Sequence, residues 1–105
     1  MGKQKSKKIR VKKVLKSKYA FDSEQGEKLF RVIYKALKIN PKVKIDFKFI
    51  EVVSNDFLLT AIAPLIDYYS IDKLNKSVKF QNITNEVKER IVYINKKYYA
   101  EKDIS

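Results

Sequence analysis

The stretch Lys42–Tyr69, KVKIDFKFIEVVSNDFLLTAIAPLIDYY, decides the fold of this 105-residue chain. It opens with an alternation in which Val43, Ile45 and Phe47 share one side and polar residues, Asp46 among them, point the other way. A period of two predicts a strand that is buried on one face. We therefore expect the centre of a sheet here, with the rest of the chain arranged around it.

A polar loop and an apolar helix follow this strand. Ser54, Asn55 and Asp56 are strong N-cap residue types in a row. They fit a strand-to-helix turn at a sheet edge, where α/β proteins often bind ligands. Residues 57–66 are apolar on nearly every side, and Pro64 is expected to kink or restart the helix. In so short a chain we expect one face of this helix to stay uncovered and to form an interaction surface.

The flanking sequence supplies the other layers of a small α/β domain. We expect, in chain order, a strand over residues 9–15, a helix over 22–38, a polar connector over 70–76, a strand over 78–80 and an amphipathic helix over 86–99. Helices that join consecutive strands favour parallel pairing. The predicted fold class is a βαβαβα domain with a mostly parallel sheet and helices packed against it. Residues 1–8 are predicted to be a basic disordered tail, and residues 9–105 the α/β domain.

The composition narrows the function classes. The chain has no Cys and no His, so thiolate and imidazole metal sites, disulfides and His-dependent catalysis are excluded. Asp46, Glu51 and Asp56 could together hold Mg²⁺, but no second catalytic group accompanies them. We therefore predict a protein that is not an enzyme and needs no cofactor. The sequence has no membrane-spanning apolar run and no secretory signal, so a cytoplasmic location follows by default.

Positive charge is concentrated near the N-terminus. The formal net charge is +12, and nine of the 24 basic residues lie in residues 1–18, which carry no acid. A solubilising tail and a phosphate-binding arm both fit this pattern. Arg occurs only three times, so any nucleic-acid binding is expected to be independent of sequence. The candidate nucleic-acid-binding residues are Lys3, Lys5, Lys7, Lys8, Arg10, Lys12, Lys13, Lys96 and Lys97.

The segment Ile45–Phe57, IDFKFIEVVSNDF, resembles the STAS-like domain family of small prokaryotic proteins of unknown function. The family pattern is a strand ending in (L/I)-D-F-x-G-V-x-x-(I/V), then a short polar loop and a helix that opens with Phe. The matching positions here are Ile45, Asp46, Phe47, Ile50, Val53 and Phe57. The first helix and the last strand–helix element agree as well, at Ser23, Gln25, Leu29, Phe80, Asn82, Val87 and Ile91.

This resemblance implies a non-enzymatic regulatory module. Relatives of the family, the STAS domains of anti-sigma-factor antagonists, bind a GHKL-type ATPase or kinase through the loop and the helix after it. The protein-binding residues expected here are Asp46, Ser54, Asn55, Asp56, Leu58, Leu59 and Ile62. The phosphorylated Ser of the antagonists corresponds to Asp56, the family Gly to Phe49, and the acidic pair early in the helix to Leu59-Thr60. These departures argue against a phosphorylation switch and against the usual partner surface.

Two functions thus stay open from sequence. The first is regulatory protein binding through the loop 54–56 and the helix after it. The second is sequence-independent nucleic-acid binding, or docking to a nucleic-acid-binding machine, through the basic arm and surface. The partner's identity and the oligomeric state, a homodimer included, are not indicated by the residues.

Overall fold

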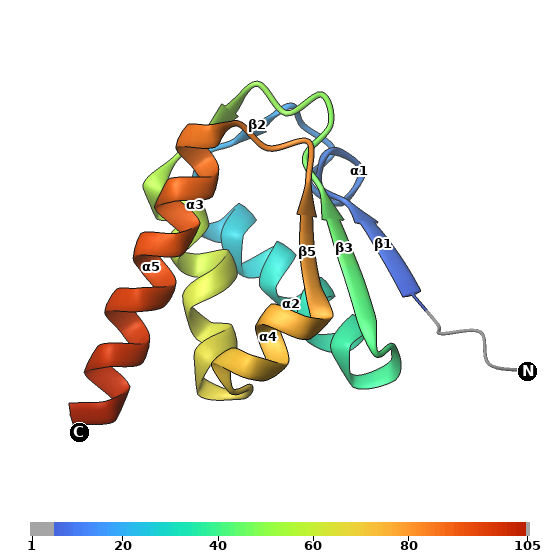
Figure 1. Ribbon diagram of the computed structural model, residues 1–105. Coiled ribbons are helices and arrows are strands. Elements are labelled where there is room, and N and C mark those ends of the chain that lie inside the picture. Colours follow the sequence, from blue (N-terminus) through green and yellow to red (C-terminus); the bar gives the residue numbers. More distant parts are fainter. Residues whose placement is uncertain (1–5, 105) are drawn as a thin grey trace, which may run out of the picture.

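Three parallel strands form the main sheet of the molecule (Figure 1). The computed structural model describes residues 6–104. The strands are β1 (Ser6–Arg10), β3 (Lys42–Asp46) and β5 (Val78–Gln81), in the order β1-β3-β5. A second, two-stranded parallel sheet joins β2 (Tyr19–Ala20) to β4 (Val52–Val53). The helices are α1 (Val11–Leu15), α2 (Ser23–Ile39), α3 (Asn55–Ile62), the 3-10 helix η1 (Ala63–Asp67), α4 (Ile71–Ser77) and α5 (Asn85–Ile104).

The helices cover only one face of the main sheet. Ile9, Val43 and Ile45 point to this face and are buried. Figure 1 shows α2 running behind the three strands, with α5 on the side away from β1. The residues that alternate with this buried set are mostly exposed lysines. We call the uncovered side the open face.

Helix α2 begins and ends at residues whose side chains stabilise helix termini. Asp22 is its N-cap, and its side chain and that of Gln25 form a reciprocal capping box. At the other end Asn40 precedes Pro41, and this disfavours continuation of the helix. This helix agrees with the predicted one to within a residue or two.

Close packing of α2 against α3 depends on Gly26. A Cβ atom at this position would lie 1.7 Å from Thr60 Oγ1 and 2.7 Å from the backbone oxygen of Phe57. Because only Gly lacks that atom, the two helices can approach so closely here. This contact fixes α3 against α2, which itself packs on the sheet.

The structure confirms the α/β class with a parallel sheet and packed helices, and it confirms the restart of the helix at Pro64, where η1 follows α3. Two predicted elements are wrong. The strand over 9–15 is wrong because it begins at Ser6 and stops at Arg10, and residues 11–15 form a helical turn. Val11 and Leu15, four residues apart, are thereby both buried.

The predicted polar connector over 70–76 is instead helix α4. Ser70 caps it, accepting a hydrogen bond from the Lys73 backbone N–H, and Leu74 is buried beneath it. Residues 6–8, assigned from sequence to the tail, pair with β3, and residues 1–5 lie outside the described part of the chain. None of the described helices has the length and apolarity needed to cross a bilayer.

Candidate functional site

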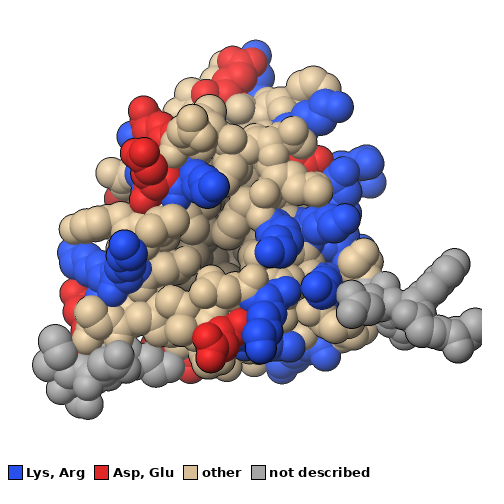
Figure 2. All heavy atoms as spheres, viewed as in Figure 1, with Lys and Arg blue, Asp and Glu red and all other residues tan. Residues whose placement is uncertain are grey.

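The open face of the sheet carries a row of three lysines. Lys8 is in register with Lys44, which is in register with Lys79, and all three are exposed. Residues in register on parallel strands point to the same face, so Arg10 and Lys42 share this side with the row. Like charges directly opposite one another destabilise a sheet. The row therefore costs stability and creates a positive surface, visible as blue atoms on the side of β1 in Figure 2.

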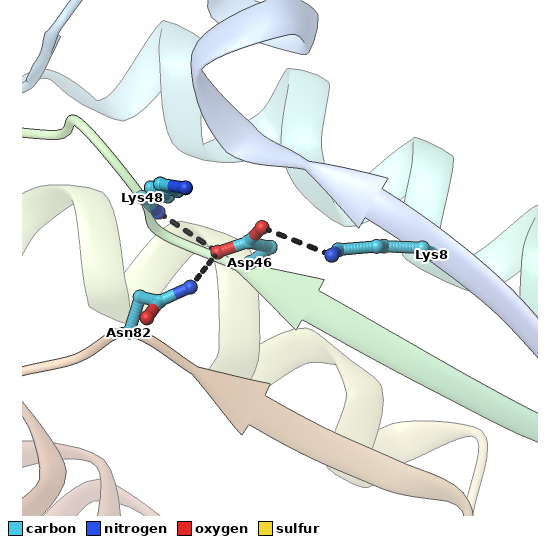
Figure 3. A network of polar contacts seen from close by, with 4 residues as sticks. All are labelled: Lys8, Asp46, Lys48 and Asn82. Carbon is cyan, nitrogen blue, oxygen red and sulfur yellow. Dashed lines mark hydrogen bonds and ion pairs between the residues drawn. The ribbon is translucent and has the colours of Figure 1, made fainter.

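Asp46 ties the strand ends together beside this row (Figure 3). Its Oδ1 accepts hydrogen bonds from Asn82 Nδ2 at 2.6 Å and from the Lys48 backbone N–H at 2.9 Å. Lys8 Nζ lies 3.5 Å from Oδ2. The Asn82 bond, with those from Lys48 and the charge of Lys8, holds the pKa of the carboxyl below its ordinary value although burial acts the other way.

Asp46 was predicted to contact a protein partner, whereas in the structure its side chain makes contacts within the fold. Only 3% of the residue is exposed, and its carboxylate oxygens are engaged by β1, by the turn after β3 and by the end of β5. Its role in the fold is to hold these segments in place.

A basic groove of about 810 Å³ lies where β1 and β3 end. It is lined by Lys8 and Arg10, by four lysines within residues 12–18, and by Lys48. Lys8 pairs with Asp46, and Lys18 pairs with Glu51 at 3.2 Å. Among the side chains that the structure describes, those of residues 6–101, no ion pair engages the other five basic side chains of this lining. The groove therefore offers uncompensated positive charge, and it shares Lys8 and Arg10 with the open face.

Phe49 is the aromatic residue of the basic groove. It is 67% exposed, and its backbone φ is 68°, in the left-handed region that favours Gly. The ammonium groups of Lys12 and Lys48 lie 5.3 and 5.1 Å from the ring centroid, within cation–π range. A positive groove that contains an accessible ring can bind both the charge and the planar groups of a ligand.

The loop predicted to bind protein is in part a helix cap. Ser54 Oγ accepts a hydrogen bond from the Phe57 backbone N–H at 3.1 Å and donates one to the backbone oxygen of Phe21. The Ser54 hydroxyl thus holds the start of α3. Asn55 and Asp56 are exposed in the first turn of that helix.

The helix after the loop is more fully covered than we expected. Leu58 and Ile62 lie in the core, with 0% and 3% exposure, so neither presents its side chain to a partner. The packing of α2, η1 and α5 around α3 covers them. Leu59 is half-buried, and with Asn55, Tyr93 and Lys97 it lines a second groove of about 430 Å³ between α3 and α5.

The predicted nucleic-acid-binding residues fall on separate surfaces. Lys8, Arg10, Lys12 and Lys13 line the basic groove. Lys7 is exposed on β1 but alternates with them. Lys96 and Lys97 are on α5, across the molecule from β1 (Figure 1), and Lys3 and Lys5 lie outside the described residues.

Sequence reasoning missed several residues of this surface: Lys42, Lys44, Lys48, Phe49 and Lys79. The alternation of Lys42 and Lys44 with Val43 and Ile45 was a usable signal. It does not reveal that no helix covers their side of the sheet. Phe49 could have been noticed as an aromatic residue directly after the basic residues Lys42, Lys44 and Lys48.

The acidic residues considered for Mg²⁺ do not gather. The described side chains, those of residues 6–101, include no group of three acidic residues placed to hold a metal ion. Asp46 is engaged as described, Glu51 pairs with Lys18, and Asp56 is exposed on α3. The Mg²⁺ alternative of Asp46, Glu51 and Asp56 is therefore wrong for the described structure.

Comparison with known protein families identifies the family to which this chain belongs. Residues 25–88 match the STAS-like domain of unknown function (DUF4325). No curated protein and no solved structure matches the chain. The matched region runs from the first turn of α2 to the first turn of α5 and includes β3, the turn with Phe49 and β5. Because it spans more than half of the sequence, the chain belongs to the family of STAS-like domains of unknown function.

Proposed function

We propose that this STAS-like domain binds nucleic acid without reading its sequence, through the open face and the basic groove, and that it is not an enzyme. The observation that carries the proposal is the row Lys8–Lys44–Lys79. Sheets rarely gain from like charges placed side by side. A bound polyanion would remove that repulsion.

The geometry suits the backbone of a nucleic acid. Neighbouring strands lie about 4.8 Å apart, so three lysines in one row span roughly 10 Å. Long lysine side chains can follow a short segment of phosphates over that distance. Arg10 and the groove lysines extend the same positive surface beyond the sheet. Phosphate contacts of this kind release counterions and carry no sequence information.

The test compares a lysine on the open face with a lysine elsewhere on the surface, so that both substitutions change the net charge equally. Labelled DNA is titrated by fluorescence anisotropy at several salt concentrations with wild type, Lys44→Gln and Lys35→Gln. Lys35 is exposed on α2, the helix that covers the opposite face of the sheet, so it controls for the change in net charge. We expect Lys44→Gln to weaken binding and to reduce the steepness of log K against log salt by about 0.9 with duplex DNA and about 0.7 with a single strand, the values for one phosphate contact. Equal effects of the two substitutions would contradict a specific binding face.

The same variants separate stability from binding. Because Lys44 lies in the middle of the row, Lys44→Gln should raise the free energy of unfolding by about 0.2–1 kcal/mol at low salt. The gain should shrink at high salt, since salt screens exposed charges. Urea unfolding at two ionic strengths measures it, and a loss of stability would show that the row is not repulsive.

Regulatory protein binding is a second candidate, favoured by the α3–α5 groove. Tyr93 there is 64% exposed and lies beside Asn55 and Leu59, which were predicted from sequence. The resemblance implies a GHKL-type ATPase or kinase as the partner. The test is a pull-down from nuclease-treated host lysate with the domain as bait. We expect a partner protein that binds wild type to be lost with the Leu59→Glu variant and retained with the Lys44→Gln variant. The opposite pattern would assign that protein to the basic surface.

A further inference from the structure

Burial in the core does not explain Phe49. Its ring is largely exposed, so it contributes little apolar burial, and the backbone at this residue is strained. A polar residue or Gly would serve a simple basic groove at least as well. The position of this ring therefore points to a ligand with a flat, apolar surface.

The turn that carries Phe49 is held in place from several directions. The backbone N–H of Ile50 donates to the Phe47 oxygen at 3.0 Å, and the positive φ at Phe49 makes this a type II turn. Phe47 N–H donates to the Gln81 oxygen at 3.0 Å, and Lys48 N–H donates to Asp46. These hydrogen bonds hold the turn after β3 in one conformation, and the turn fixes the position of the Phe49 ring.

The surroundings of the ring match the two parts of a nucleotide. Lys12 approaches it from α1 and Lys48 from the same turn, each with its ammonium group about 5 Å from the centroid. A base that stacks on the ring would displace these ammonium groups from it, and the flexible lysine side chains could then bind the phosphates on either side of that base. Base–aromatic stacking beside a positive groove is how proteins hold single strands without reading sequence.

We propose that the ligand of this surface is single-stranded nucleic acid, with one base stacked on Phe49 and the adjoining phosphates on the basic groove. The inference rests on the nucleic-acid binding proposed above and names its substrate class. In a duplex the bases stack on one another and their faces are closed to a side chain. A duplex can therefore use the lysines but not the ring, and the domain should prefer a single strand.

The experiment measures affinity for labelled oligo-dT and for a labelled duplex of equal length by fluorescence anisotropy. The variants are Phe49→Ala, Phe49→Trp and the control Phe21→Ala. Phe21 is 64% exposed and does not line the basic groove, so it controls for loss of an exposed ring. Because Phe49 is exposed, its replacement should leave the fold intact, and far-UV circular dichroism checks this.

The expected result is a roughly 5- to 150-fold loss of oligo-dT affinity in Phe49→Ala, the range for one base–aromatic stack. Duplex affinity should change less than about twofold, Phe49→Trp should keep the single-strand affinity, and Phe21→Ala should match wild type. If Phe49→Ala changes both affinities equally or changes neither, the stacking inference is wrong while backbone binding stands. If wild type binds neither probe in a salt-dependent way, the proposed function fails, and the inference fails with it.

Discussion

Replacing Phe49 by Gly and, separately, by Ala isolates the conformational cost of its turn. Both variants lose the ring and its contacts with Lys12 and Lys48, so these terms cancel in the comparison. Ala keeps a Cβ atom at φ 68°, where an L-residue is destabilised by about 1–2 kcal/mol. Gly avoids this cost but loses about 0.5–1 kcal/mol through the greater freedom of the unfolded chain. We expect the Gly variant to be more stable than the Ala variant by about 0.5–1 kcal/mol.

Thermal and urea unfolding followed by circular dichroism measure this difference. In a domain of this size about 1 kcal/mol moves Tm by roughly 4–8 °C, so the Gly variant should melt about 2–8 °C higher. Lys35, in the middle of α2, provides the control, because at an exposed helical position Ala is more stable than Gly by about 1 kcal/mol. The order should thus reverse between the two sites. If the Ala variant at position 49 is as stable as the Gly variant, the backbone at this position is not strained by a Cβ atom.

Gly26→Ala should destabilise the fold by about 1–3 kcal/mol, because its Cβ would overlap Thr60 Oγ1 and the backbone oxygen of Phe57. Adding Thr60→Ala should recover only part of this loss in urea unfolding, since the backbone contact remains; full recovery would disprove it. Leu58→Ala should cost about 2–5 kcal/mol as a core truncation, and a cost below about 0.5 kcal/mol would place Leu58 at the surface. Asp46→Asn tests the pH dependence. The pKa of Asp46 is lowered from 3.8 in the fold, so the stability it adds is complete well above pH 3.8 and is lost as the pH falls through the folded pKa. The gap in urea midpoint between wild type and Asp46→Asn should therefore narrow below pH 3.8, and a gap that widens in acid would contradict the lowered pKa.

Elements with a strong local pattern were predictable. The alternation around Val43 and Ile45 identified β3, and the apolar spacing with the cap at Asp22 identified α2. The resemblance to STAS-like domains was readable from short motifs and is confirmed by the family match over residues 25–88. It also placed a Gly at the position of Phe49, and the positive φ there gives the physical reason.

Short elements were not predictable because distant residues stabilise them. Helix α1 spans five residues and is held by burial of Val11 and Leu15. The β2–β4 pair has two residues in each strand and brings together Tyr19 and Val52, which lie far apart in the sequence. Burial of α3 was misjudged for the same reason, since the helices that cover Leu58 come from both sides of it in the chain.

The sequence by itself determined the composition of the surface: an excess of lysine, few arginines, and a central strand whose polar side alternates with its buried side. Only the tertiary structure decided where that charge lies. Strand register placed Lys8, Lys44 and Lys79 in one row, and the packing of the longer helices on the other face left that row open. The turn fixed by Asp46 set Phe49 among the groove lysines. These are long-range arrangements, and local sequence patterns carry no information about which distant segments become neighbours.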